Sequence, residues 1–340
     1  MVGALSEKLK NAMARLLDVP RFERSYEKFR RGCLQSGPIV LAYHRLSSCP
    51  GKEYPFDEEL ISADPDSFER QLEFVNRNFN VTNFQRIHEQ IASGRKIPHG
   101  SLVITFDDGY ADNYEIAYPI LVKHKVTATI FVTTGHVGTG DPFWFEKVSF
   151  YLKTLSSYDL IIESVNFKER IDENNRGMVR DTLLGILKKV PNQVRLDALG
   201  ELDTLFRGKL QEAPGHLIGT LTWDQILEMD RGGIEIGSHT VSHPVLSSME
   251  EREIRLELIE SKKMLEEKLG HEIVSVSYPV GGQFDFNPMV ERIAFESGYK
   301  FGLSYINGVN PDFSSPYALK RVHVERYQTY RRFAAELYFP

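Results

Sequence analysis

Two adjacent carboxylates, Asp107 and Asp108, follow directly on the apolar run SLVITF at residues 101–106. Consecutive side chains of a strand point to opposite faces, so a strand that runs into this pair aims the two acids in different directions. One interpretation is a polar turn at the end of a buried strand. The other is a pair of acids with separate roles, in which one binds a metal ion and the other acts as a general base.

A second stretch, SHTVSHP at residues 238–244, carries His239 and His243. The i, i+4 spacing places both imidazoles on the same face of a helical turn, where they can converge on one metal ion. With ten histidines in the chain, such a pair also arises by chance. Two histidines and one carboxylate nevertheless form a common catalytic zinc set with open positions for water and substrate. The two stretches together therefore predict a metal-dependent hydrolase.

Alternating strand and helix patterns must bring these stretches together. Short apolar runs predict strands at residues 38–44, 101–106, 127–134, 233–238, 273–279 and 301–306, with helical patterns between them. Strands that alternate with helices pair in parallel, and α/β barrels place their chemistry at the carboxyl ends of the strands. Three helical patterns with little strand signal interrupt this order at about 142–218. We therefore predict an α/β architecture with a helical insertion.

Composition excludes several other classes. At 340 residues and 41% apolar content, the chain can bury a large core. A net charge of -6 gives no electrostatic footprint for nucleic acid as a main partner. Its two cysteines, Cys33 and Cys49, argue against a disulfide framework and against a cysteine zinc site. No run of apolar residues is long enough to predict a membrane-spanning helix.

The N-terminal segment, residues 1–34, predicts an amphipathic helix that precedes a main domain of residues 35–340. Residues 1–32 hold eight basic and four acidic side chains. Two interpretations stay open: the helix packs on the body of the protein, or it makes peripheral contact with an anionic membrane surface. The segment lacks the apolar core and cleavage site of a secretory signal. We therefore expect a cytoplasmic protein, with the inner membrane face as the alternative position.

The motifs TFDDGY, SHTVSHP and SYPVGG, in this order, resemble the first three motifs of the polysaccharide deacetylase family, the NodB-type carbohydrate esterases. The likeness spans about residues 38–325. It implies a distorted (β/α)7 barrel and metal-dependent removal of an acyl group, usually N-acetyl, from a sugar. It also implies that Asp107 is the base. The implied ligands of the divalent metal, commonly Zn²⁺, are Asp108, His239 and His243.

The third motif departs from the commonest family pattern. Many members carry an arginine two residues before the motif's proline, and this arginine steadies the base. Here Ser277 occupies that position, followed by Tyr278 and Pro279, as in members with a Tyr-Pro-x-Gly version. We hypothesise that Arg321, in the late strand-like run ALKRVHVE, supplies the missing charge. The family motif implies that the backbone N–H of Val280 stabilises the oxyanion.

The general acid and the sugar contacts are less well defined. The family usually supplies a histidine from a Leu-x-His motif near the C-terminus, and no clean copy is present. His323 is a candidate by position, and His44, at the end of the first predicted strand, is the candidate that we prefer. His323 and Pro279 are also predicted to contact substrate. The predicted aromatic contacts, for which core packing is the competing interpretation, are Tyr110, Trp144 and Tyr278.

These features predict a metal-dependent N-deacetylase acting on an acetylated sugar, a nucleotide-sugar or a lipid-linked glycan. The expected cytoplasmic location favours the two linked precursors over an assembled polymer. A carbohydrate-binding or scaffold protein that keeps the fold without catalysis is the main alternative. A haloacid-dehalogenase-type phosphatase is excluded because Thr105 and Gly109 stand where its Asp-x-Asp motif needs carboxylates.

Overall fold

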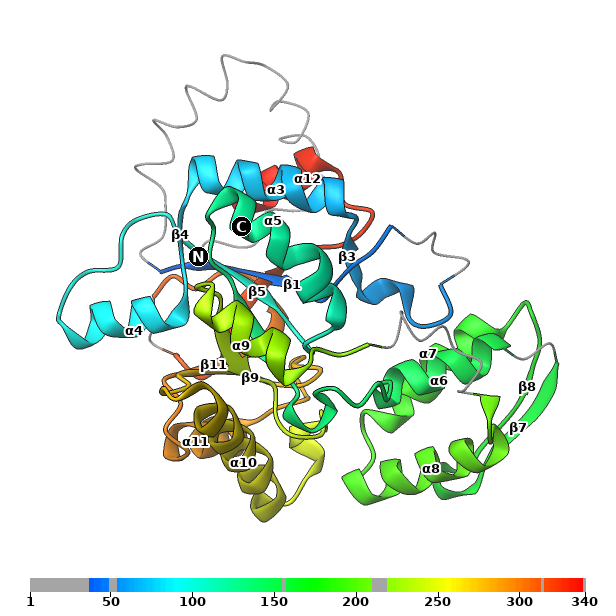
Figure 1. Ribbon diagram of the computed structural model, residues 1–340. Coiled ribbons are helices and arrows are strands. Elements are labelled where there is room, and N and C mark those ends of the chain that lie inside the picture. Colours follow the sequence, from blue (N-terminus) through cyan, green and yellow to red (C-terminus); the bar gives the residue numbers. More distant parts are fainter. Residues whose placement is uncertain (1–36, 49–53, 155–156, 210–218, 313–314, 339–340) are drawn as a thin grey trace.

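The computed structural model describes residues 37–48, 54–154, 157–209, 219–312 and 315–338 (Figure 1). The predicted helix of residues 1–34 lies outside them, as does the membrane contact proposed for that segment. Within the described residues, no helix has the length and apolar composition needed to cross a membrane.

A ring of parallel strands forms the centre of the described structure. Neighbouring strands follow the order β1-β12-β11-β10-β9-β6-β5, and β5 pairs with β1 to close the ring, with Leu41 opposite Ile104. The barrel strands are β1 Ile39–Tyr43, β5 Ser101–Phe106, β6 Thr129–Val132, β9 Glu235–Ser238, β10 Ser275–Ser277, β11 Phe301–Asn307 and β12 Leu319–His323. This architecture confirms the predicted (β/α)7 barrel.

Helices and short strands surround the ring (Figure 1). The helices are α3 Pro65–Asn78, α4 Phe84–Ala92, α5 Tyr118–His124, α9 Trp223–Arg231, α10 Glu251–Leu269, α11 Pro288–Glu296 and α12 Tyr330–Tyr338. Short strands outside the ring are β2 Arg45–Leu46, β3 Ile61–Ala63 and β4 Asn80–Thr82. Single helical turns are η2 Glu58–Leu60, η3 Asn113–Ala117, η4 Thr134–His136 and η8 Leu246–Ser248.

Helix boundaries follow local capping chemistry. Helix α3 begins after Asp64, whose carboxylate accepts a hydrogen bond from the Ser67 backbone N–H at 2.8 Å, and Pro65 occupies its first turn. Helix α10 ends at Gly270, which has a φ of 79° and so closes the helix in a conformation that favours glycine. These caps set where each helix meets the barrel.

The side chains of β5 alternate between two hydrophobic cores, and this alternation sets the direction of Asp107. Leu102, Ile104 and Phe106 belong to the large core between the barrel and its helices. Val103 belongs to a separate core that includes Phe84 of α4 and residues of β1, β6, β11 and β12. Because strand side chains alternate, Val103, Thr105 and Asp107 all face the barrel interior. Helix α4 closes the amino end of the barrel, and the carboxyl ends of the strands remain for a site.

The segment between β6 and β9 forms a side unit next to the barrel (Figure 1). Its elements are α6 Trp144–Thr154, β7 Tyr158–Ile162, η5 Glu163–Val165, β8 Phe167–Ile171, α7 Arg176–Leu187 and α8 Asn192–Leu205. The predicted helical insertion therefore also contains an antiparallel hairpin, β7–β8, which the sequence reading missed. The hairpin was missed because β8, with the sequence FKERI, has three consecutive charged residues between its two buried ends, which leaves a weak apolar signal.

Buried charges join this unit to the barrel. Arg45 Nε donates to Asp112 Oδ2 at 2.8 Å, and Arg45 Nη1 donates to Glu146 Oε1 of α6 at 3.3 Å. Burial raises the pKa of Glu146 to about 7 although the charge of Arg45 opposes this shift.

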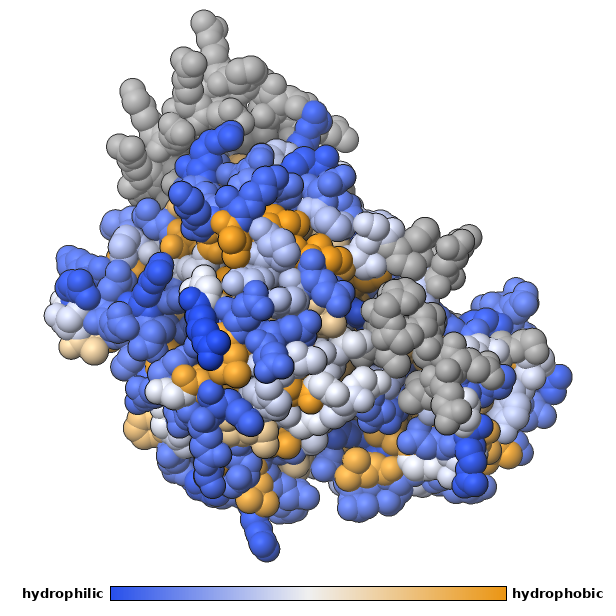
Figure 2. All heavy atoms as spheres, viewed as in Figure 1, coloured by the Kyte–Doolittle hydropathy of each residue, from blue (hydrophilic) through white to orange (hydrophobic). Residues whose placement is uncertain are grey.

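The outer surface of the protein is mainly polar. On the face shown in Figure 2, hydrophilic side chains predominate and the apolar patches are small and separate.

Candidate active site

The end of β5 separates the two adjacent acids through a change of backbone conformation. Asp107 is 2% exposed and continues the inward face of the strand. Asp108 has a φ of 74° and Gly109 a φ of 79°, so the chain turns sharply straight after Asp107. Left-handed backbone at a non-glycine residue is costly, and such strain concentrates at functional sites.

The same strain recurs in the other loops at this end of the barrel. Six described non-glycine residues have positive φ, and four of them line this end of the barrel or stand in its loops. They are Asp108 at 74°, Thr240 at 66°, His243 at 56° and Val280 at 62°. Each such residue costs of the order of 1 kcal/mol, which the surrounding structure must offset. All four belong to the motif regions identified in the sequence.

Arg321 on β12 holds Asp107 by a two-point ion pair. Its Nη1 donates to Asp107 Oδ1 at 2.8 Å and its Nη2 donates to Asp107 Oδ2 at 2.6 Å. Arg321 Nη2 also donates to the hydroxyl of Ser277 at 3.0 Å, and that hydroxyl donates to Asp107 Oδ2 at 3.3 Å. Burial raises the pKa of Asp107, but the charge and hydrogen bonds of Arg321 together with the nearby His239 and His44 outweigh it, so this pKa lies below its ordinary value. The structure thus places Arg321 where we hypothesised a compensating charge.

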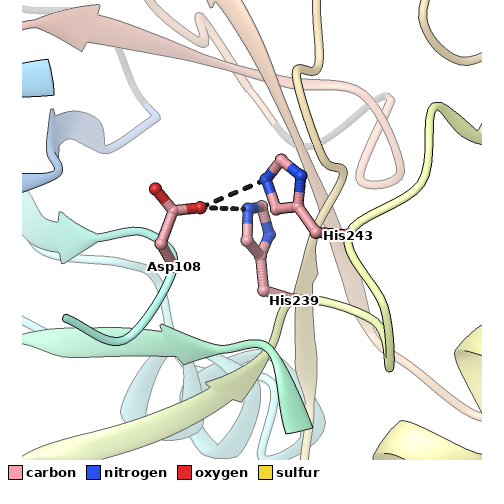
Figure 3. A group of neighbouring side chains, drawn as sticks. All are labelled: Asp108, His239 and His243. Atoms are coloured by element: carbon pink, nitrogen blue, oxygen red, sulfur yellow. Dashed lines mark ion pairs between the residues drawn. The ribbon is translucent and has the colours of Figure 1, made fainter. Parts of the chain in front are cut away.

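Asp108, His239 and His243 face one another across the barrel mouth (Figure 3). Asp108 Oδ1 lies 3.3 Å from His239 Nε2 and 3.1 Å from His243 Nε2. All three side chains are buried, and among the described residues neither oxygen of Asp108 has a hydrogen-bond donor. A buried carboxylate without donors is costly, so this arrangement requires a positive charge from elsewhere.

The chemistry of the two imidazoles fits a divalent metal ion. His239 Nδ1 lies 2.7 Å from the Ser277 carbonyl oxygen. Because a carbonyl only accepts, we assign the proton to Nδ1, which leaves a lone pair on Nε2 facing Asp108. Burial lowers the pKa of His243 to about 4, so this ring is neutral at pH 7, as a metal ligand must be. One carboxylate oxygen and two imidazole nitrogens form a donor set that suits Zn²⁺.

The loop that carries the two histidines differs from our expectation. Residues 239–243 form no helical turn; His239 directly follows β9 and His243 lies in the irregular loop after it, with ring centroids 4.9 Å apart. Glu257 of α10 braces this loop, because its Oε2 accepts hydrogen bonds from the backbone N–H groups of Val241 at 2.7 Å and Ser242 at 2.9 Å. The positive φ values of Thr240 and His243 and the hydrogen bonds to Glu257, rather than a helical turn, bring the two imidazoles together.

A cavity of about 630 Å³ opens over these side chains. The metal-site residues and Asp107 line it, together with both candidate acids, His44 and His323. Val280 and Tyr278 line the cavity as well, and the side unit contributes Phe145 and Leu184. The cavity therefore lies between the barrel mouth and the insertion, with Asp107, the metal-site residues and both candidate acids on its wall, while the fully buried Arg321 is not among its lining residues.

The two candidate acids differ in their surroundings. His323 stacks on Tyr305 with ring centroids 3.8 Å apart, and its Nε2 lies 3.1 Å from the Tyr305 carbonyl oxygen. Burial and the nearby charge of Arg321 lower the pKa of His323 to about 4. His44 is half-buried and meets Tyr305 edge-on, with ring centroids 5.2 Å apart. At neutral pH, His323 is therefore uncharged and has no second proton to give.

The structure corrects two predicted sugar contacts. Tyr110 is fully buried with Arg45 over its ring at 4.2 Å, and it does not line the cavity. Trp144 is 7% exposed, and its Nε1 donates to the His243 carbonyl oxygen at 3.2 Å, so it supports the histidine loop from behind. Tyr278 lines the cavity, but its hydroxyl donates to the Tyr317 carbonyl oxygen at 2.9 Å. Pro279 is not among the lining residues.

Several residues at the site were missed in the sequence. The Ser277 hydroxyl links Asp107 to Arg321, and Glu257 braces the histidine loop from α10. Tyr305 separates His44 from His323, and Phe145 packs near His243 with ring centroids 5.1 Å apart. Apart from Ser277, which is the first residue of the third motif, none of these residues stands in a recognisable motif. Only the serine in place of the usual arginine gave a local signal.

Comparison with known proteins identifies the family. A family model described as polysaccharide deacetylase matches residues 94–302. The chain therefore belongs to the polysaccharide deacetylase family, whose members are carbohydrate deacetylases. It is 23% identical over 286 residues to the putative polysaccharide deacetylase YxkH of Bacillus subtilis (strain 168), across 84% of this chain and 70% of that relative.

Two further matches are informative. The chain is 56% identical over 113 residues to a poly-β-1,6-N-acetyl-D-glucosamine N-deacetylase of Staphylococcus aureus (strain MSSA476), across 31% of this chain and 38% of the length of that relative. The solved structure of the Streptococcus pyogenes deacetylase PplD in complex with acetate matches at a TM-score of 0.59 and 19% identity. That match covers 90% of this chain and 100% of the streptococcal one, and shows a common fold.

Proposed function

We propose that the protein is a metal-dependent N-deacetylase that removes acetyl groups from an N-acetylated amino sugar. The observation that carries this proposal is the buried group of Asp108, His239 and His243, whose carboxylate lacks donors, beside the Arg321-held Asp107 in one cavity. The activity named for the staphylococcal relative supports an N-acetylglucosamine substrate. The cytoplasmic location and the nucleotide- or lipid-linked form of the substrate stay predictions.

In the first half of the reaction, each residue of the site has a separate role in the attack of water on the acetamide. Asp108, His239 and His243 would hold the metal ion, which supplies Lewis acidity to polarise the acetamide carbonyl and to make water nucleophilic at pH 7. Asp107 accepts a proton from the attacking water through Oδ1, which keeps a second lone pair beside its bond to Arg321 Nη1. The new C–O bond forms as negative charge collects on the carbonyl oxygen. We assign the backbone N–H of Val280 as the hydrogen-bond donor that stabilises the charge on that oxygen.

The second half of the reaction breaks the C–N bond. The departing nitrogen needs a proton to leave as an amine, and the products are acetate and the free amino sugar. We assign this proton to His44 because it lines the cavity, whereas His323 has a pKa of about 4 and is engaged by Tyr305. Arg321 and Ser277 keep Asp107 in position throughout.

The function is tested by acetate release. We expect the zinc-loaded protein to release acetate from a β-1,6-linked N-acetylglucosamine hexasaccharide, and chelation to lower the rate by about 100-fold or more. Re-addition of Zn²⁺ should restore the rate. The control substrate is a glucose hexasaccharide, which has no acetamide. A metal-loaded protein that binds the acetylated hexasaccharide without releasing acetate would instead indicate the carbohydrate-binding scaffold.

The assignment of the general acid makes a separate prediction. His44→Asn should lower kcat by about 100-fold, because proton transfer to the leaving group contributes about 10²- to 10⁴-fold. His323→Asn should lower kcat by less than about tenfold. Initial rates and the pH–rate profile distinguish the two candidates, His44 and His323, since only loss of the general acid removes the fall in rate at high pH. Full turnover by His44→Asn would reject the assignment.

A further inference from the structure

Two aromatic side chains stand out by their exposure. Phe284 is 84% exposed and Tyr327 is 78% exposed, the highest values for large apolar or aromatic side chains among the described residues. Both border the same region: Tyr327 lines the cavity over the metal-site residues, and Phe284 lines a second cavity of about 420 Å³. An aromatic ring left in water beside a cleft is a feature of ligand-binding surfaces.

The second cavity continues the first. Lys188, at the carboxyl end of α7, lines both cavities. Val280 lines the first and Gly282 lines the second, so the third motif runs from one into the other. The remaining wall of the second cavity consists of Gly185, Lys189, Ser247, Ser248, Gln283, Phe284 and Asp285. The two cavities are therefore neighbours, with Lys188 on the wall of both.

The backbone that carries Phe284 is held in place. The Ser247 hydroxyl donates to the Phe284 carbonyl oxygen at 2.7 Å, and the Ser247 N–H donates to the Asp285 carbonyl oxygen at 3.1 Å. The Gly282 N–H donates to Asp285 Oδ2 at 2.9 Å, and the Asp285 N–H donates back to the Gly282 carbonyl oxygen at 3.0 Å. The turn is thus fixed before any ligand arrives, which lowers the entropy cost of binding.

We propose that the second cavity binds a sugar unit of the substrate chain next to the unit that is deacetylated, with Phe284 as its stacking surface. This inference rests on the proposed function and assigns its substrate as an N-acetylhexosamine oligosaccharide that spans both cavities. The apolar face of a pyranose ring suits an exposed phenyl ring. Lys188, Lys189 and Gln283 bring donors to its hydroxyl and acetamide oxygens.

A nucleotide diphosphate is the competing occupant, because two lysines line the second cavity. Asp285 lines the same cavity, and its carboxylate stands on the turn that carries Phe284. A carboxylate there repels a diphosphate, whereas it can accept hydrogen bonds from the hydroxyls of a sugar. The observations therefore favour the neutral sugar chain.

Phe284→Ala tests the assignment. We expect KM for the N-acetylglucosamine hexasaccharide to rise about threefold to tenfold with kcat unchanged, while kcat/KM for methyl β-N-acetylglucosaminide stays the same. Calorimetric Kd of the hexasaccharide should rise by the same factor, and Phe284→Trp should restore both values. Phe295→Ala is the matched control, since Phe295 is 63% exposed, packs on Tyr317 and lines neither cavity.

The outcomes separate this inference from the proposed function. Wild-type protein that releases no acetate from either substrate contradicts the proposed function. An active Phe284→Ala enzyme with wild-type KM and Kd for the hexasaccharide overturns only the second sugar site. An equal loss of kcat/KM on the hexasaccharide and on methyl β-N-acetylglucosaminide also overturns only the second sugar site. Tighter binding of uridine diphosphate N-acetylglucosamine than of the hexasaccharide, abolished by Lys189→Ala, would assign the cavity to the diphosphate and also overturn the proposal.

Discussion

Arg321→Met is expected to lower the free energy of unfolding by about 3–5 kcal/mol and kcat by about 100-fold or more. Arg321 is fully buried, and both of its Nη atoms are bonded to Asp107. Removing one partner of a buried ion pair leaves the other charge without compensation, and this is the origin of the large stability loss. Denaturant unfolding and initial rates of acetate release measure the two effects.

A double substitution shows whether the stability loss comes from the broken ion pair or from lost side-chain packing. Arg321→Met combined with Asp107→Asn removes both charges, so we expect much of the lost stability to return while activity stays low because the base is absent. Arg321→Lys keeps the charge without the planar fork and should give an intermediate kcat. If Arg321→Met left both stability and kcat unchanged, the role assigned to this ion pair would be wrong.

The same pair sets a pH dependence. Burial raises the pKa of Asp107, and the charge and hydrogen bonds of Arg321 together with the nearby His239 and His44 outweigh this and hold the pKa below its ordinary value. A depressed pKa means that the stability gained from the ionised pair is present above the unfolded-state pKa of about 4. It is lost as the pH falls through the native value. In Arg321→Met the pKa-lowering charge and hydrogen bonds of Arg321 are gone while burial remains, so the acid limb of the pH–rate profile should move to higher pH.

The double variant His239→Ala, His243→Ala is expected to lose its bound metal and its activity together. One carboxylate cannot hold Zn²⁺ alone at neutral pH, since such sites use at least three protein ligands. We expect metal content, measured by mass spectrometry after gel filtration, to fall from about one equivalent to background. Acetate release should fall to the rate of the chelated enzyme.

A second group of possible ligands provides the matched control. Glu69, Glu73 and His124 also lie close enough to hold a metal ion, but they are exposed or half-buried, and Glu69 is paired with Lys123 at 2.6 Å. His124→Ala should therefore keep the metal content and activity of the wild type. Unaltered metal content in the His239→Ala, His243→Ala variant would contradict the site assignment.

Local patterns in the sequence were sufficient for the parts of the site that lie next to each other in the chain. The acids Asp107 and Asp108 follow a strand whose alternation directs Val103, Thr105 and Asp107 inward, so their divergence follows from backbone geometry alone. The strand-helix alternation predicted parallel pairing, the family resemblance implied a barrel, and the closed parallel ring confirms both. His239 and His243 were found by residue type and spacing, although a braced loop, rather than a helical turn, brings them together.

Tertiary structure decided what depends on distant contacts and on burial. Arg321 meets Asp107 across 214 residues of sequence, and only the pairing of β12 with β1 and β5 with β1 brings them within hydrogen-bonding distance. Tyr110 and Trp144 have the residue type of sugar contacts, but packing on Arg45 and on the histidine loop removes them from the cavity. The 84% exposure of Phe284 is likewise a property of the folded chain, in which its backbone is bonded to Ser247. Residue type and spacing thus determined which chemistry the chain can perform, whereas barrel closure determined which side chains surround that chemistry, because burial is a property of the folded chain and not of any short segment.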